Sequence, residues 1–209
     1  MRRALAALVA ASALLLAGCT SDDGLAAQYR EGSGKNYIAG DGTVQEWGVG
    51  ERGEPIEFAG PTVDGEAFDS AEHAGEVLVV NFWYAACAPC RVEAPILQEL
   101  SAEFDGEGAQ VVGVNVRDQA GTAASFERDY GIGYPSILDI EQGQAQLAFA
   151  GPVRPNAVPT TIVLDREHRV AARILGAIAE ASIIDTIVAD LVDEPAGEAL
   201  GAEPAAGRG

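Results

Sequence analysis

The sequence predicts an α/β fold in which a mixed central sheet is flanked by helices. Residues 77–82 and 110–116 are nearly continuous apolar runs, the pattern of strands that are buried on both faces. Residues 89–104, which lie between these runs, are expected to form a helix. Residues 160–164 and 169–175 are expected to form two further strands joined by a short turn. Strand–helix–strand followed by a hairpin indicates a sheet with both parallel and antiparallel neighbours.

The first eighteen residues have the composition of an export signal. Arg2 and Arg3 form a positive segment, and residues 4–16 form an apolar stretch that is too short to span a membrane comfortably. Two small residues then precede Cys19. This segment resembles the bacterial lipobox, and the resemblance implies cleavage before Cys19 and a lipid on its sulfur. An ordinary signal peptide or an uncleaved anchor, with Cys19 incidental, is the alternative. In each case the domain is expected outside the cytoplasm, where disulfides persist.

Two segments without apolar periodicity flank the predicted domain, which covers residues 46–192. Residues 19–45 are rich in Gly, Ser, Asp and Ala, and we expect them to form a flexible tether. Residues 193–209 are rich in Ala, Gly, Glu and Pro, and we expect a disordered tail.

Several smaller elements complete the predicted domain. Residues 55–63 and 66–68, separated by an Asp-Gly turn, predict a hairpin extension at the amino-terminal side. A helix is expected over residues 122–130, where a following glycine is a stop signal. Residues 141–149 predict a short helix, and residues 179–192 predict the closing amphipathic helix.

The charge of the chain excludes some classes of partner. The net charge is −19, so phosphate groups would be repelled and non-specific nucleic-acid binding is not expected. An anionic membrane surface would be repelled too, and any membrane attachment must therefore be covalent or hydrophobic. The two histidines, His73 and His168, fall in polar turn regions and are expected at the surface.

Cys87 and Cys90 form a Cys-x-x-Cys motif where the buried strand gives way to a helix. The first turn of a helix presents unpaired N–H groups and the positive end of the dipole, so the pKa of a thiol there falls. Pro89 suits this first turn. The spacing lets both sulfurs meet within one turn. The motif therefore predicts a redox-active pair that needs no cofactor.

Other uses of the motif fit less well. A zinc site needs four ligands, and the sequence has neither a second such motif nor paired histidines. A c-type haem site needs a histidine after the second cysteine, where Arg91 stands. A structural disulfide would close too short a loop to give much entropic stabilisation.

The chain resembles the thioredoxin superfamily, and within it the TlpA/ResA/CcmG-like branch of exported, membrane-tethered reductases. The resemblance covers roughly residues 45–192, and three motifs carry it jointly. They are Asn81-Phe82-Trp83 leading into Cys87-Ala88-Pro89-Cys90, then Glu93-Ala94-Pro95, then Ala157-Val158-Pro159-Thr160-Thr161. The resemblance implies a thioredoxin-like fold with an amino-terminal hairpin extension.

The resemblance also implies roles on the active helix. Cys87, nearest the helix end and the surface, is expected to attack, and Cys90 is expected to resolve the mixed disulfide. Glu93 lies on nearly the same helix face as Cys90. It is expected to be a partly buried carboxylate that exchanges a proton with Cys90, without affecting overall stability. Spacing alone leaves another role open for Glu93, that of a first-turn acid complementing the helix dipole.

A second loop is expected beside the cysteines. Pro159 is expected to follow a cis peptide bond, and the backbone of Val158 to be offered to the substrate chain. Trp83 is expected to pack around the active helix, with substrate contact as its alternative role. Two residues depart from the pattern. Asn81 stands where cytoplasmic thioredoxins carry a buried aspartate, and Ala86 stands where many relatives have tryptophan.

Together these features predict a thiol–disulfide oxidoreductase, lipid-anchored at the extracytoplasmic face of the cell membrane. The leading hypothesis is a reductase that takes electrons from a membrane thiol donor and reduces disulfides in exported proteins. The haem-site cysteines of apocytochrome c are one candidate substrate. The alternatives are a disulfide-forming oxidase and a non-catalytic metal- or solute-binding lipoprotein. The Ala-Pro pair between the cysteines favours a reductase over the oxidases, whose loops contain histidine.

Overall fold

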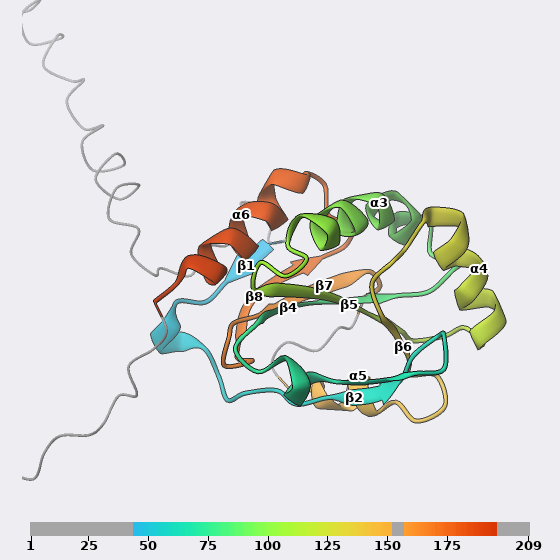
Figure 1. Cartoon of the computed structure of the whole chain (residues 1–209), viewed down its shortest axis with the longest axis horizontal. Coiled ribbons are helices and arrows are strands. Elements are labelled where there is room, and N and C mark those ends of the chain that lie inside the picture. Colours follow the sequence, from blue (N-terminus) through green and yellow to red (C-terminus); the bar gives the residue numbers. More distant parts are fainter. Residues whose placement is uncertain (1–43, 152–156, 196–209) are drawn as a thin grey trace, which may run out of the picture. The chain divides into compact units, whose positions relative to one another are not determined.

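The computed structural model describes residues 44–151 and 157–195, which belong to one compact unit (Figure 1). The predicted signal peptide, Cys19, nearly all of the predicted tether and most of the predicted tail lie outside these residues. No helix within the described ranges is long and apolar enough to span a membrane.

Within the described residues, six strands form one sheet, which is mixed, as predicted. Their order across the sheet is β1 (Val44–Glu46), β8 (Val170–Leu175), β7 (Thr160–Leu164), β4 (Val77–Trp83), β5 (Ala109–Asn115) and β6 (Ser136–Leu138). β4 pairs in parallel with β5, and β5 with β6, whereas the remaining pairs are antiparallel. The apolar β4 lies inside the sheet and is buried along its whole length.

Helices cover both faces of this sheet (Figure 1). The elements outside it are β2 (Ala59–Pro61), β3 (Ala67–Asp69), α3 (Ala88–Glu103), α4 (Ala120–Tyr130), α5 (Gln144–Ala148), α6 (Ala181–Asp193) and the 3-10 turns η1 (Val49–Glu51) and η2 (Ser70–His73). α3 and α6 lie side by side on one face, and α5 lies with the β2–β3 hairpin on the other. α4 ends at Gly131, whose φ of 67° is left-handed, as the predicted stop signal requires.

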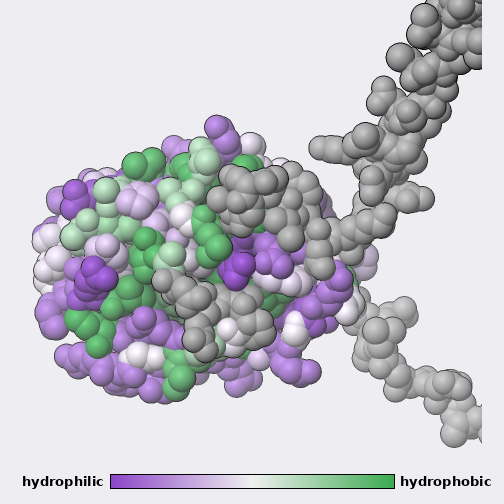
Figure 2. Space-filling view, turned by 180° about the vertical axis from the view of Figure 1, so that it is seen from behind, coloured by the Kyte–Doolittle hydropathy of each residue, from purple (hydrophilic) through white to green (hydrophobic). Residues whose placement is uncertain are grey.

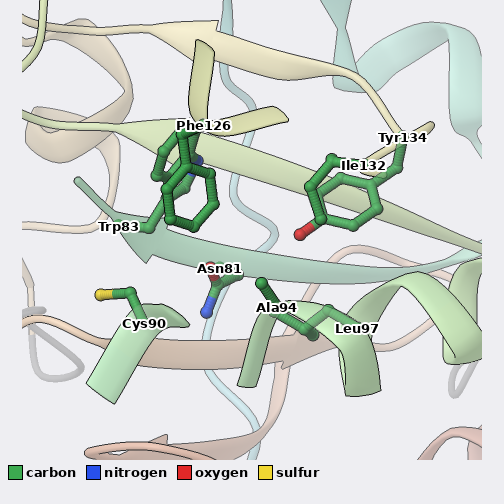
Figure 3. A pocket seen from close by; sticks show the side chains of 8 residues that line it. All are labelled: Asn81, Trp83, Cys90, Ala94, Leu97, Phe126, Ile132 and Tyr134. Carbon is green, nitrogen blue, oxygen red and sulfur yellow. The ribbon is translucent and has the colours of Figure 1, made fainter. Parts of the chain in front are cut away.

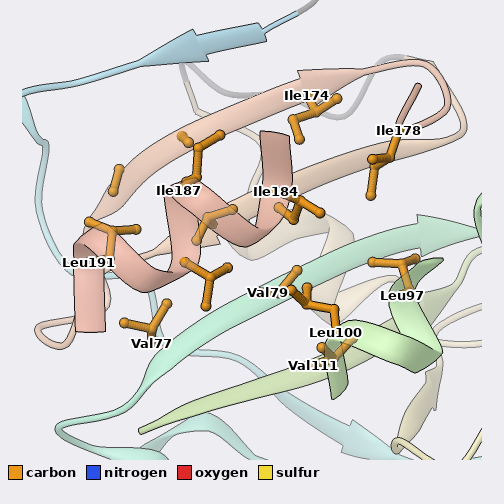
Figure 4. Packing of buried hydrophobic residues seen from close by; sticks show 14 of the residues in the cluster. Val77, Val79, Leu97, Leu100, Val111, Ile174, Ile178, Ile184, Ile187 and Leu191 are labelled. Atoms are coloured by element: carbon orange, nitrogen blue, oxygen red, sulfur yellow. The ribbon is translucent and has the colours of Figure 1, made fainter. Parts of the chain in front are cut away.

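The alternation of side chains along β4 divides the core between the two faces. Val77 and Val79 join the cluster beneath α3 and α6 (Figure 4), whereas Leu78, Val80 and Phe82 join the cluster on the opposite face. Because side chains alternate along a strand, Asn81 and Trp83 point to the α3 face. The end of β4 therefore directs two functional side chains towards the helix that carries the cysteines.

The folded unit extends beyond both predicted domain boundaries. Val44, placed in the predicted tether, is buried in the core and pairs with Ile174 in β8. α6 runs to Asp193, and the carboxylate of Glu194 accepts hydrogen bonds from Arg52. β1 and β6 were not predicted, because these three-residue strands are too short to show a hydrophobic period and have no hairpin turn like the Asp-Gly that indicated β2 and β3.

The expectation that both histidines are surface residues is wrong for His168. Its side chain is buried, and Nε2 lies 3.2 Å from the carbonyl oxygen of His73. His73 itself is half-buried and stacks on Phe68, with ring centroids 5.0 Å apart. The turn that ends β7 therefore packs against the segment before β4. On the face seen in Figure 2, hydrophilic and hydrophobic residues are interspersed.

Candidate active site

Cys87 and Cys90 form a disulfide at the junction of β4 and α3. Cys87 is the N-cap residue of α3, and the backbone N–H of Cys90 donates to Cys87 Sγ at 3.2 Å. A thiolate at Cys87 would therefore receive a hydrogen bond and face the positive end of the helix dipole. Both cysteines are 2 % exposed. The expected difference in exposure is absent, and it is the cap position that distinguishes the two sulfurs.

The Val158–Pro159 peptide bond is cis, and its loop lies against the disulfide, as predicted. The carbonyl oxygen of Val158 is 3.9 Å from Cys87 Sγ. The hydroxyl of Thr160 donates to the carbonyl of Ala157 at 2.6 Å, which closes the turn. The loop that precedes β7 thus forms one wall beside Cys87.

Glu93 lies one turn beyond Cys90 and is 1 % exposed. Asn81 Nδ2 donates to one carboxylate oxygen at 2.8 Å, and the backbone N–H of Ile178 donates to the other at 3.0 Å. Burial raises the pKa of Glu93 to about 7, although these two hydrogen bonds oppose the shift. The carboxyl is held between β4 and the segment before α6. We therefore expect its titration to affect stability as well, in contrast to the expectation from the sequence.

Asn81 connects Glu93 with the neighbouring strand. Its amide also donates to Thr161 Oγ1 at 3.0 Å, and Asn81 itself is 2 % exposed. An aspartate at this position would place a second acidic group beside Glu93. The asparagine instead supplies a donor, which suits a site whose single titrating carboxyl is on α3.

A small cavity of about 10 Å³ lies next to Cys90 (Figure 3). This volume is roughly what one water molecule needs. The wall includes Asn81, Trp83 and Tyr134, and the Tyr134 hydroxyl points inward in Figure 3. Burial raises the pKa of Tyr134, and the negative charge of Glu93 contributes to the same direction. Within this site Tyr134 therefore stays a neutral hydroxyl.

Trp83 is held in the cavity wall by aromatic packing. Its ring lies 4.5 Å from that of Phe126 between centroids, and only 4 % of the residue is exposed. A Cβ at Gly113 would lie 2.8 Å from Trp83 Nε1 and 2.5 Å from Ser136 Oγ, so the indole needs a glycine there. The predicted packing role of Trp83 agrees with this environment.

The segment between β4 and the cysteines is held by residues that sequence reasoning missed. Asp118 Oδ2 accepts from the backbone N–H of Ala85 at 2.6 Å and from Asn115 Nδ2 at 2.9 Å. Asn115 is completely buried at the end of β5. The available signal was a polar residue at the end of a buried strand, Asn115, followed three positions later by Asp118. Cys19, the predicted lipidation site, lies outside the described residues.

No cluster of three or more His, Cys, Asp or Glu side chains that could hold a metal ion occurs in the described ranges.

Residues 53–173 match the model of the AhpC/TSA family. The chain belongs to this family. The matched segment includes both the Cys87–Cys90 disulfide and the cis-proline loop beside it.

Named relatives of this AhpC/TSA-family chain are thiol–disulfide enzymes. The chain is 27 % identical to the thiol-disulfide oxidoreductase ResA of Bacillus subtilis, over 66 % of this chain and 74 % of ResA. It is 33 % identical to the thiol:disulfide interchange protein HelX of Rhodobacter capsulatus, over 67 % of this chain and 74 % of HelX.

Solved structures agree with the architecture. A DsbF homologue from Corynebacterium diphtheriae has a TM-score of 0.63 and 34 % identity, covering 76 % of this chain and 100 % of its own. A secreted thiol-disulfide isomerase from Corynebacterium glutamicum has a TM-score of 0.66 and 32 % identity, covering 77 % and 98 %. The family, the fold and the Cys87–Cys90 pair together identify a thiol–disulfide oxidoreductase of thioredoxin-like fold.

Proposed function

We propose that this chain is an extracytoplasmic reductase of disulfides in exported proteins. The observation that carries the proposal is the buried carboxyl of Glu93, one helical turn from a cysteine pair that caps α3. The reduced pair supplies two electrons, and the oxidised pair is re-reduced by a thiol donor at the membrane.

The first step is attack by the Cys87 thiolate on a partner's disulfide. A new sulfur–sulfur bond forms between Cys87 and the partner, and the partner's second sulfur leaves as a thiolate that takes up a proton. The Cys90 N–H and the helix dipole favour Cys87 as the thiolate. The substrate chain would lie along Val158, whose carbonyl is already beside the sulfur.

In the second step Cys90 attacks Cys87, the intramolecular disulfide forms, and the partner's remaining thiol is released. Cys90 must lose its proton before it attacks. Glu93 can accept that proton because the pKa of its carboxyl is near neutrality. Asn81 donates to Glu93 and also lines the cavity beside Cys90, so the amide lies between the carboxyl and the space next to this cysteine.

The buried carboxyl also favours reduction over oxidation. Strong disulfide oxidants owe their potential to a reduced form in which the thiolate is unusually stable. A carboxylate close to the cysteine pair has the opposite effect, because its negative charge disfavours a nearby thiolate. The reduced form is therefore less stable, and the pair donates electrons more readily.

We expect a midpoint potential below about −220 mV, whereas a strong oxidase would lie near about −120 mV. Equilibration of the full chain with glutathione or dithiothreitol buffers, followed by thiol alkylation, measures it. A second assay measures the reduction of insulin by dithiothreitol with and without the chain. A reductase or an oxidase should accelerate this reaction, whereas a non-catalytic metal- or solute-binding lipoprotein should not. A potential near that of the oxidases would favour the disulfide-forming alternative.

We further propose that a lipid on Cys19 holds the domain at the extracytoplasmic face of the cell membrane. The support is the short apolar segment and the two small residues before Cys19, together with a net charge of −19 that makes electrostatic attachment unfavourable. A fatty-acid label fed to expressing cells should mark the wild-type chain and leave Cys19→Ala unlabelled. Equal labelling of the two would remove this part of the proposal.

A further inference from the structure

We propose that the rim of the active site recognises a polypeptide segment that carries carboxylate side chains beside its disulfide. This inference rests on the proposed reductase function and adds the chemistry of the partner to it. The observation is that Arg91 and Arg117, far apart in the sequence, both lie against the loop that leads into Cys87.

Arg91 is fixed by a single hydrogen bond to this loop. Its Nε donates to the carbonyl oxygen of Ala85 at 3.0 Å, while the side chain as a whole is exposed on α3. The guanidinium has five donor hydrogens, and this bond uses one of them. Both terminal nitrogens of Arg91 are therefore left for a ligand, immediately after Cys90 in the chain.

Arg117 reaches the same loop from the end of β5. Its guanidinium carbon lies 4.1 Å from the centre of the Tyr84 ring, a cation–π geometry. Arg117 is also exposed. Because Tyr84 and Ala85 are consecutive, two guanidinium groups are placed over successive residues of one short segment before Cys87.

Neither Arg91 nor Arg117 forms an ion pair with any carboxylate among residues 44–151 and 157–195, where Arg52 and Arg169 are the arginines paired with acidic side chains. Other arginines in these ranges are also without an ion pair, so it is the position at the loop before Cys87 that sets Arg91 and Arg117 apart. Asp118 is the acidic residue bound to the loop, but its Oδ2 accepts from the Ala85 N–H and from the Asn115 amide.

Carboxylate is the ligand that this arrangement fits. A guanidinium binds a carboxylate through two parallel N–H···O bonds, and holding the side chain in place beforehand lowers the entropy lost on binding. The whole chain carries a net charge of −19, which at long range repels an acidic partner. At short range, the two arginines near Cys87 therefore favour substrates that carry a carboxylate beside the disulfide.

The test uses three disulfide-bridged peptides of equal length whose flanking residues are Asp, Asn or Lys. Single-turnover reduction by the reduced full chain gives a second-order rate constant for each. We expect the Asp peptide to react about tenfold faster than the Lys peptide, since each exposed charge pair contributes about threefold. Arg91→Gln or Arg117→Gln should lower this ratio to about threefold. The double variant should bring it to one or below, because the net charge of −19 then favours the Lys peptide.

Controls separate charge from other effects. Arg166→Gln, in the turn between β7 and β8 at the opposite end of the sheet, should keep the wild-type ratio. Arg91→Lys with Arg117→Lys should retain most of it. Because the ratio compares peptides on one protein sample, a change in the Cys87 pKa or in the folded fraction cancels.

Two results would overturn the inference and leave the reductase proposal intact. One is equal rates for all three peptides, and the other is an Asp preference that persists in the double variant. If no peptide is reduced, including the neutral one, then the proposed reductase function fails and the inference fails with it.

Discussion

The full chain with Cys90→Ser should accumulate disulfide-linked complexes with its protein partners. Removing Cys90 leaves Cys87 able to attack, because the N-cap position and the N–H at residue 90 remain. The intermediate then has no second thiol to release it. Turnover of a disulfide substrate should fall by about three orders of magnitude or more, since a serine hydroxyl cannot replace the thiolate.

The matched control for this experiment is Cys87→Ser. It should lose turnover as completely but trap no partner, because Cys90 lies inside the first turn of α3 and the Val158 carbonyl is beside Cys87 rather than Cys90. Non-reducing electrophoresis after rapid alkylation, with mass spectrometry of the complexes, measures trapping. Complexes that form with Cys87→Ser and are missing with Cys90→Ser would reverse the two roles.

Replacing Glu93 with glutamine should slow the second step of the reaction and flatten its pH dependence. In the wild-type chain the rate of resolution should change around pH 7, where the carboxyl titrates. One pKa unit corresponds to about 1.4 kcal/mol, so an effect of about tenfold is expected. The measurement is stopped-flow release from a preformed mixed disulfide across pH. Attack by Cys87 should change less, because it depends mainly on the helix end.

The same substitution should alter the pH dependence of stability. The folded-state pKa of Glu93 is raised from 4.5 to about 7, so the folded state binds the proton more tightly than the unfolded state. The free energy of unfolding should therefore be higher below about pH 4.5 and fall as the pH rises to about 7. Between these limits the wild-type chain should lose roughly 3 kcal/mol more than Glu93→Gln. Urea unfolding at several pH values measures this difference.

Glu99→Gln is the matched control, because Glu99 is an exposed glutamate on the same helix. It should keep the wild-type pH profiles of both resolution and stability. If Glu93→Gln and the wild-type chain share one pH–rate curve and one stability curve, Glu93 is only an acid that complements the helix dipole, and its place in the mechanism is lost.

Much of the molecule could be predicted from local sequence. The nearly continuous apolar run over residues 77–82 determined a strand buried on both faces, and the following Cys-x-x-Cys with Pro89 determined a redox pair at a helix start. The strand at residues 160–164 begins and ends where predicted. These features depend on contacts within a few residues, so hydrophobic periodicity and the residue types at helix ends are enough to predict them.

Tertiary structure decided what surrounds the sulfurs. The carboxyl of Glu93 meets the Asn81 amide and the Ile178 backbone, which is 85 positions away in the chain. Arg117 reaches Tyr84 from the end of the neighbouring strand β5, and β1, which begins inside the predicted tether, pairs with β8. No local pattern encodes such contacts, because they exist only once the strands have taken their order and the helices have closed on the sheet. The pKa of Glu93 follows from that closure, since burial raises it. The sequence could predict a partly buried carboxyl beside Cys90, but not the Asn81 and Ile178 groups that hold it.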